Sequence, residues 1–135
     1  MLIDADRARQ KLAAIRLING ALALFAPRLL IRRLGTDPDR DPSAIYPFRM
    51  FGIRTLIIGA DLLLLTGEEQ RRATKLAVLI HATDTASAAT CLVKGYLPRK
   101  AGIVATAISG LNTVLAVIAA RDAVLDETAG RPVHR

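Results

Sequence analysis

The sequence has few of the residues on which many catalytic and metal-binding sites depend. Of 135 residues, one is cysteine, two are histidine and none is tryptophan. The single cysteine, Cys91, excludes a disulfide within the chain. No zinc-type, P-loop, dinucleotide-binding or nucleophile-elbow motif is present, and we predict no metal and no cofactor. A metal site built from His81, Asp84, Asp61 and Cys91 is the weaker alternative, because no second histidine lies nearby in the sequence.

Aromatic residues make up only 4% of the chain, although the formal net charge is +7. A basic protein without aromatic side chains to stack on bases lacks the usual features of a single-strand nucleic-acid surface. Its basic residues instead cluster at the ends of apolar runs, at residues 28–33, 71–75 and 94–100. This placement favours contact with anionic lipid headgroups and predicts the lipid bilayer, not nucleic acid, as the partner.

Four apolar runs hold most of the hydrophobic residues, which make up 52% of the chain. They predict spans at about residues 9–26, 48–66, 75–93 and 101–120, the last with no charged residue. Because about 20 apolar residues cross the hydrocarbon core of a bilayer, we predict an all-α protein, a four-transmembrane-helix antiparallel bundle. Residues 1–135 then form a single membrane domain with a polar tail at 121–135. A soluble helical bundle is the alternative, because the first and third runs are short.

The connections agree with four spans. The polar, proline-rich residues 35–47 predict a loop, and residues 27–35 before it predict a short helix in the membrane interface. Gly95 is expected near a helix C-terminus. Four spans place both termini on one side of the membrane. The basic residues divide almost equally between the two sides, and we place the termini in the cytoplasm.

Ionisable and amide side chains recur inside the runs at helical spacing. Isolated charges at such depth cost several kcal/mol, so they are expected to face the bundle interior and to pair. We expect Asp61 to pair with Arg16 or His81. We expect Arg54 to meet Asp84 or the amides. The candidate acid/base residues are Asp61, His81 and Asp84, and the candidate ligand-binding residues are Arg16, Asn19, Arg54 and Asn112.

The second run carries the pattern R-x-x-G-x-R-x-x-x-x-G, at Arg49, Gly52, Arg54 and Gly59, and the third carries H-x-x-D, at His81 and Asp84. In these motifs the sequence resembles, over residues 12–120, small bacterial four-helix membrane proteins that are classified as a domain of unknown function. The resemblance implies an integral protein of the bacterial cytoplasmic membrane. It implies no activity and no catalytic residue.

Several functions are compatible with charges inside such a bundle. The first is a protein that binds a polar or amphipathic ligand or partner within the bilayer, including a subunit of a larger membrane assembly. The second is a compact membrane enzyme with Asp/His acid-base chemistry on a lipophilic substrate, and the third is a small proton-coupled transporter. A purely structural ion pair is the alternative to all three. The small residues around Gly102, Thr106 and Gly110 predict close helix packing, either within the chain or in a homo-oligomer.

Overall fold

The computed structural model describes residues 4–128, and every regular element among them is helical. The long helices are α1 (Ala5–Phe25), α3 (Ile45–Leu64), α4 (Gly67–Val93) and α5 (Arg99–Thr128). A short helix α2 (Pro27–Arg33) and the 3₁₀ turn η1 (Pro42–Ala44) lie between α1 and α3. The predicted all-α class is therefore confirmed. Residues 121–128, predicted as part of a polar tail, continue α5, while residues 129–135 lie outside the described part.

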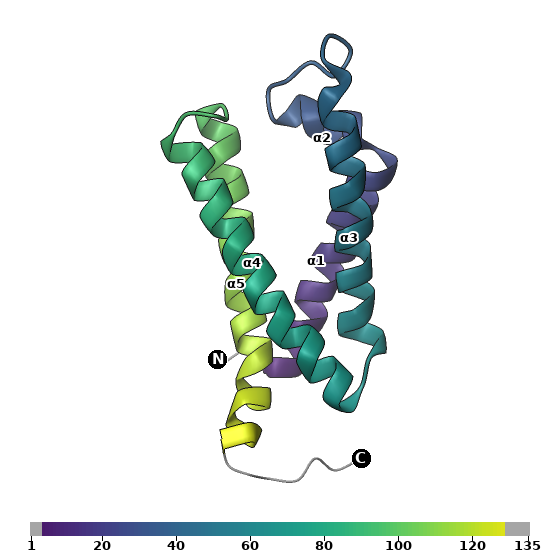
Figure 1. The fold of residues 1–135 in the computed structure, drawn as a ribbon, viewed down its shortest axis with the longest axis vertical. Helices are drawn as coiled ribbons and strands as arrows, with labels where there is room; N and C mark the ends of the chain where they lie inside the picture. The colour runs from purple at the N-terminus through teal and green to yellow at the C-terminus, as the bar shows by residue number, and fades with distance from the viewer. Residues whose placement is uncertain (1–3, 129–135) are drawn as a thin grey trace.

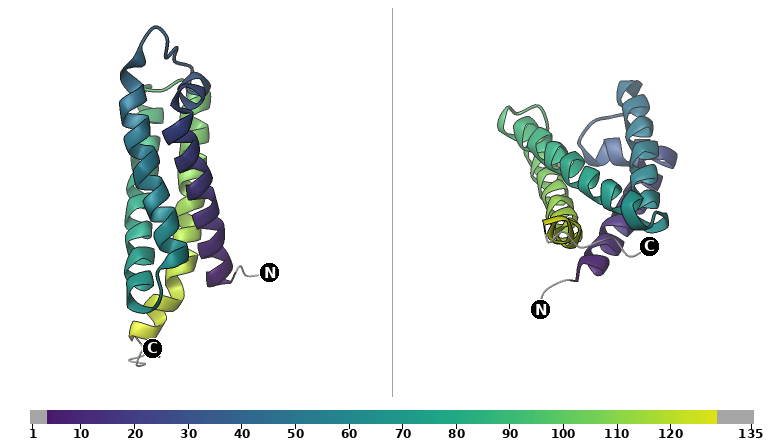
Figure 2. Two further views of the ribbon diagram at one scale, coloured as in Figure 1. Left: turned by 90° about the vertical axis from the view of Figure 1, so that its right-hand side faces the viewer. Right: turned by 60° about the horizontal axis from the view of Figure 1, so that its bottom comes forward.

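The four long helices alternate in direction but form two separate pairs. Figure 1 shows α1 beside α3 and α4 beside α5, with the pairs close together where α1 begins and diverging toward α2 and the α4–α5 turn. Figure 2 shows the same arrangement from the side. At the closed end, buried side chains from all four long helices form the core: Ala8, Leu12, Ala13, Leu62, Ala77, Leu115 and Ala116. The compact four-helix bundle that the sequence predicted is thus not confirmed.

Glycines allow α1 and α3 to approach at backbone distance. A Cβ atom on Gly52 would lie 2.6 Å from the backbone nitrogen of Leu24 and 2.9 Å from the carbonyl oxygen of Gly20. Two turns further along α3, a Cβ on Gly59 would lie 3.2 Å from the carbonyl oxygen of Ala13. Small residues at such contacts give helices close van der Waals packing, which is a usual way to join helices in a membrane.

The predicted close packing along α5 has a different outcome. A Cβ on Gly102 would lie 2.9 Å from the side chain of Leu92 on α4, so this glycine does serve helix contact. A Cβ on Gly110 would meet no atom within 4 Å. Only part of the small face of α5 is therefore used within the chain.

Two helices are long and apolar enough to cross a membrane, namely α4 and the Arg99–Arg121 part of α5. The α1–α2 pair has the required composition together, but its two helices meet at 101°, so it is a third span only if the bent pair counts as one. Helix α3 is not among these candidates, and it carries Arg49, Arg54 and Asp61 in its 20 residues. Two or three membrane-spanning helices are thus supported by length and composition.

The helix between α1 and α3 and the loop after it form an ordered polar cap. The predicted short helix is confirmed as α2, which is followed by Gly35 with φ +84°. In the loop, Asp39 accepts hydrogen bonds from Arg28 and Arg32, the latter at 2.6 Å. The hydrogen bond from Arg32, together with the two positive charges, lowers the pKa of the Asp39 carboxyl below its usual value. The turn between α4 and α5 also matches its prediction, since Gly95 follows the end of α4 with φ +69°.

Candidate functional site: an aspartate shared by two arginines

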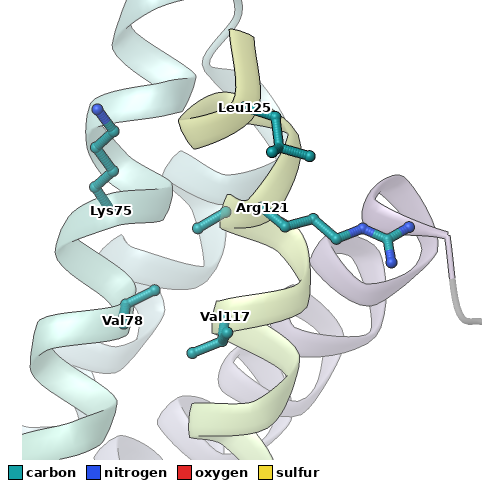
Figure 3. A pocket seen from close by; sticks show the side chains of 6 residues that line it. Lys75, Val78, Val117, Arg121 and Leu125 are labelled. Atoms are coloured by element: carbon teal, nitrogen blue, oxygen red, sulfur yellow. The ribbon is translucent and has the colours of Figure 1, made fainter. Parts of the chain in front are cut away.

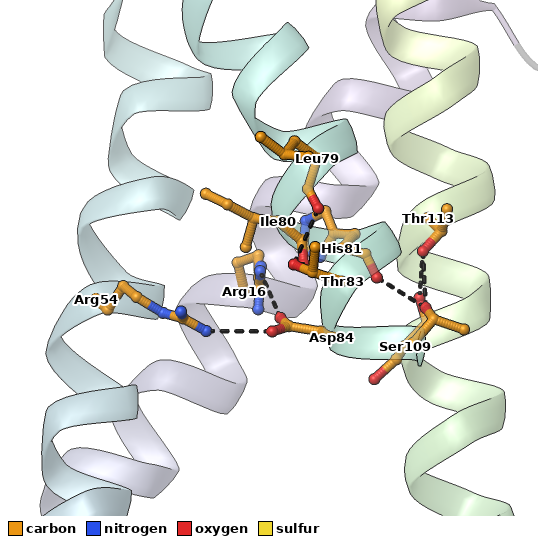
Figure 4. Close-up of polar contacts among 10 residues, drawn as sticks. Arg16, Arg54, Leu79, Ile80, His81, Thr83, Asp84, Ser109 and Thr113 are labelled. Carbon is orange, nitrogen blue, oxygen red and sulfur yellow. Dashed lines mark hydrogen bonds and ion pairs between the residues drawn. The ribbon is translucent and has the colours of Figure 1, made fainter. Parts of the chain in front are cut away.

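Asp84 of α4 is the centre of an ion cluster between the two helix pairs. One carboxylate oxygen lies 3.6 Å from Nη2 of Arg16 on α1, and the other lies 3.4 Å from Nη2 of Arg54 on α3. Figure 4 shows both guanidinium groups directed at this carboxylate. We call these three residues the Arg–Asp–Arg cluster. It joins the α1–α3 pair to α4 beyond the apolar core, toward the end where the pairs diverge.

The three side chains differ sharply in exposure. The side chain of Arg16 is 3% exposed, that of Asp84 is 27% exposed and that of Arg54 is 52% exposed. The guanidinium of Arg54 also lies 5.8 Å from the ring centroid of Phe51, one turn earlier on α3, in a cation–π arrangement. The cluster therefore has one buried arginine and one that faces the outside of the protein.

The cluster carries two positive charges and one negative charge. The Nε and Nη2 atoms of Arg16 are buried and have no hydrogen-bond partner, because the contact of Nη2 with Asp84 is too long for a good hydrogen bond. A buried guanidinium with unpaired donors is costly unless an acceptor completes it. The donors of Arg16 thus lack a hydrogen-bond acceptor, and an anion bound at the cluster would supply one.

Two of the predicted polar residues, His81 and Asn112, are buried beside this level of the bundle, and each has one side-chain atom without a hydrogen-bond partner. His81 lies one turn before Asp84 on α4 and is fully buried, and its Nε2 atom has no partner. Asn112 on α5 is buried, and its side-chain oxygen is likewise unpaired. Buried polar atoms without partners are rare in proteins. The interior therefore contains unused hydrogen-bonding capacity on α4 and α5 as well as at Arg16.

A pair of threonines joins α4 to α5 at the same depth. The hydroxyl oxygens of Thr85 and Thr113 lie 2.9 Å apart, so one donates to the other. Each is also within bonding distance of a carbonyl oxygen one turn earlier in its own helix, 2.8 Å for Thr85 and 3.0 Å for Thr113. Neither threonine was among the predicted site residues, because a lone threonine in a helix gives little signal.

The predicted pairs are formed only in part. Arg54 meets Asp84, as predicted. Arg16 contacts Asp84, and Asp61 pairs with neither Arg16 nor His81, so the predicted pairing of Asp61 is wrong. Asp61 is half-buried near the end of α3, and among the side chains that the structure describes it forms no ion pair. Asn19 is half-buried on α1 and makes no side-chain hydrogen bond within the same part of the chain.

The described residues offer no cluster for a metal. Among the side chains that the structure describes, those of residues 4–121 and 125, no three of His, Cys, Asp or Glu gather closely enough to hold a metal ion. Two pockets are formed on α4 and α5, and neither is lined by Asp61, His81 or Asp84.

No family model, curated protein or solved structure matches this chain.

Proposed function

We propose that this chain is an integral membrane protein in which the Arg–Asp–Arg cluster binds the anionic group of an amphipathic ligand or partner within the bilayer. The four long helices cross the bacterial cytoplasmic membrane with both termini in the cytoplasm. Helix α3 crosses as the partner of α1, and its Arg54 reaches Asp84 of the second helix pair.

The observation that carries the proposal is the sharing of one carboxylate by two arginines, one of them half-exposed. A cluster with a net positive charge at bilayer depth attracts an anion, because charge interactions are weakly screened there. Arginine's planar fork suits carboxylate and phosphate groups. Arg54 is the entry residue, since it is accessible from outside while Arg16 is buried. In this view Asp84 holds both arginines in place until the ligand's anionic group joins them.

The proposal is tested by native mass spectrometry of the protein extracted from membranes in mild detergent. The wild-type protein is expected to retain a reproducible anionic amphipathic adduct, and Arg54→Gln is expected to lose it. Arg49→Gln is the matched control, because Arg49 is an exposed arginine five residues earlier on the same helix. It removes the same charge and should leave the adduct in place.

A second variant separates binding from a purely structural ion pair. Asp84→Asn removes the carboxylate that competes with the ligand but leaves both arginines. If the cluster is a binding site, the folded Asp84→Asn protein keeps the adduct or retains it more strongly. An empty wild-type protein, or equal adduct levels in wild type and Arg54→Gln, contradicts the proposal.

A further inference from the structure

A second region of the protein has the features of a lipid site and lies apart from the Arg–Asp–Arg cluster. It comprises two pockets at the end of the molecule where α4 begins. The first has a volume of about 480 Å³ and is lined by Lys75, Val78, Val117, Ala120, Arg121 and Leu125. The second, of about 460 Å³, is an open depression on the outer face of α4 and is lined by Arg72, Lys75, Leu76 and Leu79. Lys75 lines both.

The two pockets share one chemical pattern. In each, aliphatic side chains lie further into the apolar part of the helices than the basic ones, namely Val78 and Val117 in the first and Leu76 and Leu79 in the second. Figure 3 shows the Lys75 side chain directed toward the end that carries Leu125, with Val78 and Val117 on the opposite side, further into the molecule. Lys75 and Arg121 also take part in interactions within the protein. Arg72 is exposed. Glu68, in the first turn of α4, pairs with Arg71 at 3.4 Å.

The position of Lys75 along α4 agrees with the surface of a membrane. Residues 75–93 form the apolar part of the helix, and 19 residues at 1.5 Å each give about 28 Å, close to the thickness of the hydrocarbon core. Lys75 then lies where hydrocarbon meets headgroups, and its side chain extends toward the headgroups, as lysines at helix ends do. Val78, Val117 and Leu79 then lie at the depth of acyl chains, whereas Leu125 lies on the headgroup side.

We propose that this region binds one anionic glycerophospholipid, with its headgroup at Arg72 and Lys75 and one acyl chain in each pocket. Two apolar pockets on either side of one cation match a lipid that has two chains and one charged headgroup. Basic residues at the membrane surface favour anionic over zwitterionic lipids. The inference rests on the membrane insertion proposed above, but it does not depend on a ligand at the Arg–Asp–Arg cluster.

The test compares phosphatidylglycerol with phosphatidylcholine of the same acyl chains, added to the detergent-solubilised protein and measured by native mass spectrometry. Wild type is expected to retain phosphatidylglycerol about tenfold more strongly. Arg72→Gln/Lys75→Gln is expected to lose this preference. Arg99→Gln/Lys100→Gln is the matched control, since it removes two exposed positive charges at the other end of the α4–α5 pair and should keep the preference.

A second pair of variants tests the acyl-chain pockets. Val117→Phe places a ring in the first pocket, whereas Val114→Phe adds the same bulk to an exposed position of α5 outside that pocket. The first is expected to reduce lipid retention severalfold and the second to leave it unchanged. The inference is overturned if both double charge variants lose the preference for phosphatidylglycerol equally, or if wild type shows no such preference. It is also overturned if a second copy of the chain is bound in place of lipid. If the membrane-extracted protein keeps its Arg54-dependent adduct but shows no lipid preference, the lipid site is refuted and the proposed function is not.

Discussion

Arg16 of α1 and Asp84 of α4 lie 3.6 Å apart, although their helices belong to different pairs and lie far apart in the sequence. Arg54 reaches the same carboxylate from α3. The two helix pairs touch mainly at the end where α1 begins. The cluster joins them again beyond the apolar core, toward the end where the pairs diverge. The cluster carries a net positive charge. The residues that join the two helix pairs are therefore also the ones proposed to bind an anion.

Removing the carboxylate of Asp84 should destabilise the protein far more than removing that of Asp61, the other aspartate predicted in the bundle interior. Asp84→Asn leaves the buried Arg16 without its anion, and breaking a buried pair in this way costs about 3 kcal/mol. Asp61→Asn should cost less than about 1 kcal/mol, because Asp61 has no ion pair in the described part of the chain. Unfolding in mixed detergent micelles compares the two variants. Equal destabilisation would mean that Asp61 takes part in the cluster after all.

The glycine contact between α1 and α3 should tolerate no added atom. Gly52→Ala places a Cβ against the backbone of α1, and the resulting shift should cost about 1–3 kcal/mol. Gly110→Ala is the control, because its Cβ meets nothing and alanine favours the helix by up to about 1 kcal/mol. The same unfolding measurement distinguishes them. A neutral Gly52→Ala would contradict the close crossing.

The threonine pair should act as one unit between α4 and α5. Single Thr85→Val and Thr113→Val variants should each destabilise the protein slightly, and the double variant should cost less than their sum. Hydrogen bonds between helices in a membrane are worth about 0.6 kcal/mol on average, so a coupling energy of this size is expected. A double-mutant cycle in detergent measures it. Strict additivity would show that the two hydroxyls do not interact.

The loop carboxylate Asp39 should titrate below an ordinary aspartate. The hydrogen bond and charge of Arg32 lower its pKa in the folded protein. Its contribution to stability is therefore present above the pKa of the unfolded chain and is lost as pH falls through the lower folded value. Carbon-13 NMR of the Asp39 carboxyl follows the titration directly. Arg32→Gln should raise this pKa, whereas Arg33→Gln should leave it unchanged.

The sequence predicted what local pattern determines. Apolar runs, polar loops and Gly95 were sufficient for the all-helical class, the short helix after α1 and the end of α4. The divergence of the two pairs could not be predicted, because it depends on which helix faces meet. One signal was present: Gly52 and Gly59 are seven residues apart and lie on one face of α3, which indicates a small-residue contact with another helix.

The cluster could have been predicted more fully from charge alone. Between residues 70 and 121, Asp84 is the only acidic residue. An interior arginine of α1 or α3 that finds its partner on this stretch of α4 or α5 can therefore meet no other carboxylate. The sequence pattern predicts the partner of Arg54 correctly but matches Arg16 with Asp61, because both lie at a similar depth. Depth along a helix does not reveal which way a side chain faces across the bundle.

The most direct test of the account is the depth of the cluster in a bilayer. The chain has no tryptophan, so Ile57→Trp places a single fluorophore at an exposed position one turn beyond Arg54 on α3. Tyr46→Trp, at the start of the same helix, is the reference for the membrane surface. In vesicles with lipids brominated at defined positions, bromines near the chain ends should quench the Ile57→Trp variant most, and bromines near the headgroups should quench the Tyr46→Trp variant most. Equal, weak quenching of both variants, or protein that stays outside the vesicles, would contradict the account.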